Sequence, residues 1–233
     1  MLSFTEQIKV DNQDMELYVS VPDGTGPFPA VVVAQHAGGV DTFIRTMTDR
    51  LAEAGYVAVA PDLYHRLAPD QQRTPRQLKD AEMIADVRAT VAFLQQHNAV
   101  DSKALGITGF CMGGRVAYLM AAAIPQFKAA VAYYGGNIMV PLGEGVVSPF
   151  ARTHEIHSPL LFHFGEEDRN PSLEDMQKLD AELTRYNKVH EFYTYPDAGH
   201  AFMDATSERY RESAANASWP RTLDFFARHL RSM

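Results

Sequence analysis

The sequence predicts an α/β fold: a doubly wound, mostly parallel β-sheet with helices on both faces. Three observations predict it. Short runs of alanine and β-branched residues, such as AVVVA at Ala30–Ala34, are typical of strands buried on both faces. From residue 30 onward such runs alternate with segments of helical periodicity. Glycines and prolines punctuate the chain between them.

The chain before residue 30 is expected to form a hairpin and a loop. Ile8–Val10 and Glu16–Val21 have strand-like composition and flank the polar segment Asp11–Asp14, where the turn is expected. The Gly/Pro-rich segment Pro22–Pro29 then predicts a loop that leads into the first buried strand.

The first half of the alternation surrounds that buried strand. Thr42–Ala54 has helical periodicity and should end where Gly55 caps it. Val57–Ala60 is the next buried strand. Polar residues 65–78 contain two prolines and predict a loop, and Leu78–Gln96 has apolar residues at helical spacing.

The second half repeats the pattern. The last helix is expected to open at Trp219-Pro220, because proline suits a first helical turn, and to run to about Leu230. The elements before it are predicted as the strand Ala104–Thr108, the helix Arg115–Ala123, the strand Ala129–Tyr134, the irregular segment Gly135–Pro159, the strand Leu160–Phe164, the helix Ser172–Tyr186 and the strand Val189–Tyr195.

Residues 109–113 read GFCMG and carry the strongest functional signal. Between a strand and a helix, this pattern fits the G-x-nucleophile-x-G elbow of the α/β-hydrolase fold, with cysteine in place of the usual serine. The strained nucleophile needs small neighbours, which Gly109 and Gly113 provide. The helix N-terminus behind Cys111 favours a thiolate. A buried structural cysteine is the alternative, but the flanking strand and helix favour a nucleophile.

A nucleophile needs a base and a group that orients the base. The loop GEEDRNP follows one predicted strand and offers Asp168 after two glutamates, whereas PDAGHAF follows the next strand and offers His200. The order Cys111, Asp168, His200 is that of α/β-hydrolases. Three alternatives stay open: the acids of GEED lie in a solvated loop without a catalytic role, His200 is a structural histidine, or Asp197 is the local partner of His200.

An oxyanion hole is expected from two backbone N–H groups. One is that of Met112, directly after the nucleophile. The other is that of Ala37, in the loop Gln35–Val40 after the first buried strand, where Gly38 and Gly39 permit close approach. An ordinary strand-to-helix turn is the alternative for this loop.

Together these residues resemble the dienelactone hydrolase (carboxymethylenebutenolidase) family. The resemblance runs from about Pro29 to Leu230 and rests on VVVAQHAGGV, AVAPDLYHR, GITGFCMGGRVAY, AVAYYGG, LLFHFGEEDRNP, YPDAGHAF and RTLDFF. It implies an α/β-hydrolase without a large cap domain, no cofactor, Cys111 as nucleophile, His200 as base and Asp168 as the orienting acid.

Two positions depart from the family pattern. His36 stands where well-studied members carry a glutamate that contacts the resting thiol, and Asp204 stands where a carboxylate-binding arginine is expected. A carboxylate at that position should disfavour an anionic substrate. His36 could contact substrate, promote a standing thiolate or only pack its loop. The residues expected to contact substrate are His36, Tyr64, Arg73, Arg76, Tyr134, Phe202 and Asp204, with Arg66 a further candidate for an anion site.

Size and composition limit the remaining choices. The 233 residues suit a single domain spanning 1–233, and a net charge of −8 without a basic face argues against nucleic acid. A lone cysteine fits a reducing compartment. No signal peptide or membrane-length apolar run is visible, so we expect a cytoplasmic protein without a membrane partner, a monomer or weak homodimer. HEIH at His154–His157 lacks the spacing of zinc ligands, so no metal is expected.

The sequence therefore predicts a cofactor-free hydrolase of small esters or lactones. Cys111 would attack the carbonyl and form a thioester, which water activated by His200 would hydrolyse. Two alternatives stay open: an esterase or thioesterase with no preference for lactones, and a non-catalytic ligand-binding or thiol-redox protein on the same fold.

Overall fold

The computed structural model describes residues 1–68 and 70–231. Position 69, inside the predicted loop over 65–78, and the last two positions lie outside the described residues. The strands are β1 Leu2–Val10, β2 Gln13–Val21, β3 Phe28–Ala34, β4 Val57–Pro61, β5 Val100–Phe110, β6 Phe127–Tyr133, β7 Leu160–Gly165 and β8 His190–Tyr195. The helices are α1 Thr42–Glu53, α2 Asp80–Gln96, α3 Met112–Ala123, α4 Leu173–Arg185 and α5 Glu212–Leu230, with short 3₁₀ helices at Pro75–Gln77 and Phe150–Glu155.

The strands form one sheet in the order β1-β2-β4-β3-β5-β6-β7-β8. The pairs β1–β2 and β2–β4 are antiparallel, and all neighbours from β4 to β8 are parallel, which confirms the predicted doubly wound α/β fold. The chain runs outward from β3 to β4 and then resumes on the other side at β5. Such a reversal leaves a crevice beyond the carboxyl ends of the two central strands, where ligands of this fold bind.

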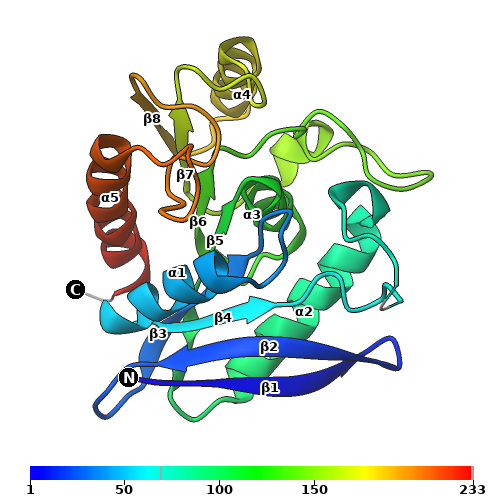
Figure 1. Cartoon of the computed structure of the whole chain (residues 1–233), viewed down its shortest axis with the longest axis vertical. Coiled ribbons are helices and arrows are strands. Elements are labelled where there is room, and N and C mark those ends of the chain that lie inside the picture. Colours follow the sequence, from blue (N-terminus) through cyan, green and yellow to red (C-terminus); the bar gives the residue numbers. More distant parts are fainter. Residues whose placement is uncertain (69, 232–233) are drawn as a thin grey trace.

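Two layers of core packing cover the two faces of the sheet. Alternate residues of β3 point to opposite faces: Val32 belongs to the core layer that also includes residues of α2, α3 and α4, whereas Val31 and Val33 belong to the layer that includes residues of α1 and α5. Figure 1 shows α1 and α5 on one side of the sheet and α2 and α3 on the other. All residues of β4 are buried, as predicted for a strand covered on both faces.

The hairpin is tighter and longer than predicted. Gln13 and Asp14 belong to β2 and pair with β1, so the turn is only Asp11-Asn12. These two residues have φ angles of 49° and 64°. Positive φ at both positions matches the right-handed twist of a two-residue hairpin, and Asp and Asn tolerate it.

The last helix begins before the predicted position. α5 starts at Glu212, so Pro220 lies inside the helix and does not open it. Proline removes one backbone donor but keeps a helical φ. Burial of Ala214, Ala215 and Trp219 under the sheet offsets that loss, because helix stability in proteins comes mainly from packing.

None of the helices within the described residues is both long enough and apolar enough to span a membrane.

Candidate active site

Cys111 stands at the turn from β5 into α3, with φ 58° and ψ −117°. A Cβ atom on Gly109 would lie 2.0 Å from the carbonyl oxygen of Gly113, and one on Gly113 would lie 2.0 Å from that of Ala34. The close approach of β3, β5 and α3 therefore requires glycine at both positions. The turn leaves the Cys111 side chain partly exposed at the carboxyl end of the sheet.

His200 and Asp168 come from loops after neighbouring strands, β8 and β7. Nδ1 of His200 lies 2.9 Å from Oδ2 of Asp168, whose side chain is only 2% exposed. The second carboxylate oxygen, Oδ1, accepts a hydrogen bond of 2.9 Å from the Asn170 backbone N–H. Asp168 is thus buried and satisfied, whereas Glu166 and Glu167 are exposed.

The thiol and the imidazole shift each other's pKa. Burial alone would raise the pKa of Cys111, but the interaction with His200 and the backbone N–H groups of Met112 and Ala37 outweighs it and lowers the pKa. Burial alone would lower the pKa of His200, but the hydrogen bonds with Asp168 and Cys111 raise it to about 10. Both shifts favour a thiolate beside an imidazolium.

The loop after β3 is held against the thiol by several contacts. The buried Tyr64 hydroxyl donates a 3.0 Å hydrogen bond to the Ala37 carbonyl. His36 Nε2 lies 2.7 Å from Oδ2 of Asp41, the residue that caps α1. Gly39 has φ 86°, which closes the turn. The His36 ring is thus directed at the start of α1, and Tyr64 supports the loop.

A cavity of about 340 Å³ opens beside Cys111 and His200. Its apolar lining includes Met112, Val140 and Leu142. Polar groups on its wall come from four further residues, Arg76, Arg115, Asn137 and Asn170. This mixture of apolar walls and a few polar groups is typical of a small-molecule site.

A buried ion pair supports one wall of this cavity. The guanidinium of Arg115 binds the Asp80 carboxylate at 2.5 and 2.9 Å, and it also donates to the carbonyls of Asn137 and Val140 at 3.1 and 2.6 Å. Asp80 also accepts from the Leu142 backbone N–H at 3.0 Å. Sequence reasoning did not identify this pair. The sequence feature that could have indicated it is Arg115, a lone arginine at the start of an otherwise apolar helix.

The other predicted contact residues lie around the site in different ways. Tyr134 is buried, and its ring meets His200 edge-on at 5.2 Å. Phe202 is fully buried and packs on Tyr134 at 5.1 Å. Asp204 Oδ1 accepts hydrogen bonds from the backbone and hydroxyl of Thr206 at 2.9 and 2.7 Å, so its carboxylate caps its own turn.

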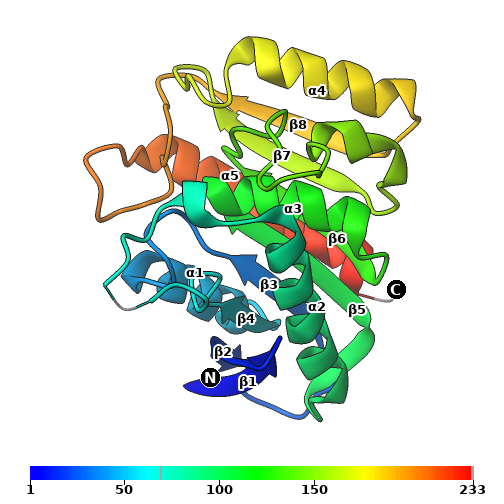
Figure 2. The ribbon, with the colours of Figure 1, turned by 90° about the vertical axis from the view of Figure 1, so that its right-hand side faces the viewer.

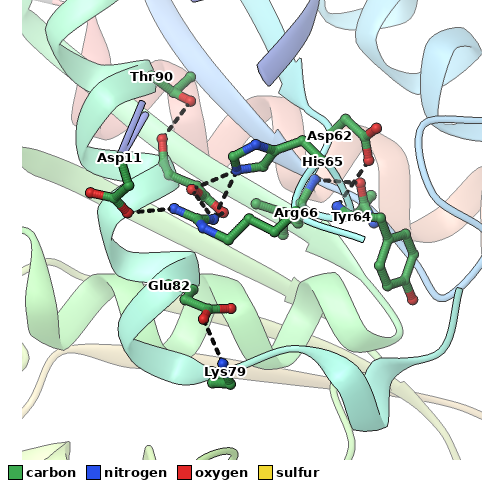
Figure 3. A network of polar contacts seen from close by, with 11 residues as sticks. Asp11, Asp62, Tyr64, His65, Arg66, Lys79, Glu82 and Thr90 are labelled. Atoms are coloured by element: carbon green, nitrogen blue, oxygen red, sulfur yellow. Dashed lines mark hydrogen bonds and ion pairs between the residues drawn. The ribbon is translucent and has the colours of Figure 1, made fainter. Parts of the chain in front are cut away.

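The three candidate arginines of the PDLYHR region and the loop after it have different surroundings. Arg66 is bonded to the buried Asp86 and to Asp11 at 2.7 Å, and Figure 3 shows it reaching Asp11 beside His65. Arg73 lines a separate cavity of about 130 Å³, together with Tyr18 and Asp62. Only Arg76 lines the cavity that contains Cys111.

Within residues 1–68 and 70–231, no group of three or more His, Cys, Asp or Glu side chains is arranged to hold a metal ion.

Comparison with known proteins gives consistent matches. The model of the dienelactone hydrolase family matches residues 15–230. A Synechocystis protein named "Putative carboxymethylenebutenolidase" is 33% identical and covers 97% of this chain and 98% of its own. A Bradyrhizobium protein named "Probable 2-oxo-3-(5-oxofuran-2-ylidene)propanoate lactonase" is also 33% identical, over 91% of this chain and 89% of its own. The crystal structure of a "Putative Dienelactone Hydrolase" from Klebsiella pneumoniae has a TM-score of 0.90 at 31% identity, covering 98% of this chain and 99% of that one.

Proposed function

The chain belongs to the dienelactone hydrolase family, and on that premise we propose that it hydrolyses ester or lactone bonds of small substrates. Cys111 is the nucleophile, His200 the base and Asp168 the acid that orients the base. The observation that carries the proposal is a thiol at a strand-to-helix elbow beside an imidazole that is bonded to a buried carboxylate.

The first half-reaction transfers the acyl group to sulfur. The thiolate of Cys111 attacks the carbonyl carbon, and the electron pair of the C=O bond moves to oxygen. The backbone N–H groups of Met112 and Ala37, which contact the resting sulfur, donate hydrogen bonds to this oxyanion. The oxyanion then re-forms the C=O bond while the bond to the leaving oxygen breaks, the His200 imidazolium gives its proton to that oxygen, and a thioester remains.

The second half-reaction releases the acid. Neutral His200 takes a proton from water, and the resulting hydroxide attacks the thioester carbonyl. Collapse of this intermediate expels the Cys111 thiolate, so the acid leaves and the thiolate–imidazolium pair returns. Asp168 keeps the proton on Nδ1 of His200 throughout, which leaves Nε2 free for both transfers. Each step uses only protein groups and water.

The substrate is a small ester or lactone because the cavity beside Cys111 holds only about 340 Å³. One relative supports a lactone over an open ester: the Bradyrhizobium protein is named as a probable lactonase. An esterase without lactone preference is the second candidate, and the apolar wall at Val140 and Leu142 supports it.

The test is turnover of p-nitrophenyl acetate and of a panel of unsubstituted lactones by wild type and Cys111→Ala. We expect Cys111→Ala to lower turnover by at least about 10³-fold, as for loss of a triad nucleophile. Iodoacetamide should inactivate the wild type with modification at Cys111. Turnover that survives both treatments would contradict the nucleophile assignment. A wild type that hydrolyses no ester or lactone would favour a non-catalytic or redox role.

A further inference from the structure

Four arginines stand apart from the others. Most arginine side chains bind a carboxylate or a carbonyl, or lie over an aromatic ring, as Arg228, Arg231 and Arg50 do. Among the described residues, four guanidinium groups have no hydrogen-bond or ion-pair partner. They are Arg73, Arg76, Arg169 and Arg209, and the last two line one groove at His200.

This groove has a volume of about 320 Å³ and lies next to the Cys111 cavity. His200 and Asn170 line both of them, so the two hollows meet at the imidazole. Arg169 comes from the loop after β7, directly after the acid of the proposed triad. Arg209 comes from the long loop between β8 and α5, drawn in orange in Figure 2.

The charge of the groove opposes that of the chain. The whole molecule carries a net charge of −8, yet two unpaired guanidinium groups face this groove and only Glu167 contributes an exposed carboxylate to it. The Asp168 carboxylate is buried and bonded to His200. Unpaired arginines beside an open groove attract and bind anions.

The chemistry of His200 fixes which half of a substrate lies in the groove. Its Nδ1 is bonded to Asp168, so the proton for the leaving group comes from Nε2, within hydrogen-bond reach of the leaving oxygen. The leaving half therefore extends past the imidazole. The acyl half stays on the Cys111 side, between the apolar residues Val140 and Leu142.

Building on the proposed function, we propose that Arg169 and Arg209 bind an anionic group on the leaving half of the substrate. The preferred substrate is then an ester with an apolar acyl group and an anionic alcohol or phenol. The Asp204 carboxylate, which caps its own turn at Thr206 and does not line the groove, does not oppose this.

The test uses two pairs of esters, one with a charge on the leaving half and one with a charge on the acyl half, each matched by a neutral ester. Para-butanoyloxybenzoate has an anionic leaving group, and its methyl ester is the neutral match. Para-nitrophenyl monosuccinate has its charge on the acyl half, and para-nitrophenyl butanoate is its neutral match. We expect the double variant Arg169→Gln/Arg209→Gln to lower kcat/KM roughly fivefold to tenfold for para-butanoyloxybenzoate and less than about twofold for the other three.

The control is Lys103→Gln/Lys128→Gln, which removes the same charge at the amino ends of β5 and β6. It should leave all four kcat/KM values within about twofold, which separates local binding from overall charge. Equal effects of the arginine variant on anionic and neutral leaving groups, or no effect, would overturn the inference. Loss of all turnover in Cys111→Ala would still uphold the proposed function, so the two failures are distinguishable.

Discussion

Cys111 has backbone angles that residues other than glycine seldom adopt, with φ 58° and ψ −117°. Such a conformation costs about 1–3 kcal/mol and persists only where the surrounding structure enforces it. Here the contacts of Gly109 and Gly113 enforce it. The consequence is that the sulfur stands clear of β5, with the N-terminus of α3 behind it and the His200 ring beside it.

At the same scale, the assignment of Asp168 as the acid of the proposed triad can be tested against its neighbours. Asp168→Asn should lower kcat for p-nitrophenyl acetate by about 10³-fold or more, because an amide cannot hold the His200 proton on Nδ1. Glu167→Gln is the matched control, because Glu167 is exposed and one residue away. If Glu167→Gln is the damaging change and Asp168→Asn is tolerated, the acid has been misassigned.

The lowered pKa of Cys111 predicts the pH dependence of its alkylation. An ordinary thiol reacts faster as pH rises through about 8.5, because only the thiolate is nucleophilic. Cys111 should instead reach its full rate at a lower pH than an ordinary thiol, and the rate should fall when pH drops through the lowered pKa. The measurement is the rate constant for iodoacetamide as a function of pH.

The same measurement tests His36. Its ring is bonded to Asp41 at 2.7 Å, so we expect His36→Gln to leave the alkylation profile unchanged. A profile displaced to higher pH in this variant would instead assign His36 a part in forming the thiolate.

At the scale of elements, the cleft depends on contacts between segments distant in the chain. Arg115 at the start of α3 reaches Asp80 at the start of α2 and the carbonyls of residues 137 and 140. A charge pair this buried is tolerable because both carboxylate oxygens of Asp80 and all three guanidinium nitrogens of Arg115 have hydrogen-bond partners. It fixes the wall formed by residues 137–142 and thus the shape of the cavity beside Cys111.

Elements that depend on local sequence could be predicted, whereas elements that depend on tertiary contacts could not. The buried strands, the elbow glycines and the α1 cap at Gly55 depend on local composition and backbone freedom, and the predictions for them agree with the structure. The start of α5 does not, because tertiary burial outweighs the local effect of Pro220.

The residues of the site also fall into those that could be predicted from the sequence and those that could not. Cys111, Asp168 and His200 could be located because the carboxyl ends of parallel strands share one edge of the sheet. The Arg115–Asp80 pair and the Arg169–Arg209 groove depend on side chains that meet only in three dimensions. No spacing in the sequence indicates either of them.

At the scale of the whole molecule, both core layers share the same strands. Val32 packs against one layer and its neighbours Val31 and Val33 pack against the other, so neither layer has a sheet of its own. Unfolding of one layer would expose the opposite face of β3. This arrangement supports the prediction that residues 1–233 form a single cooperative domain.

Equilibrium unfolding in urea tests that prediction with two probes. Trp219 is the only tryptophan, is 8% exposed on α5, and has the Arg50 guanidinium of α1 4.4 Å from its ring, so its fluorescence reports the α1–α5 layer. Far-UV circular dichroism reports the helices of both layers. Because the layers share β3 to β7, we expect the two transitions to have the same midpoint, although chains of this length often populate intermediates. A fluorescence midpoint clearly below the dichroism midpoint would mean that α1 and α5 unfold on their own, and the chain would then contain two cooperative units.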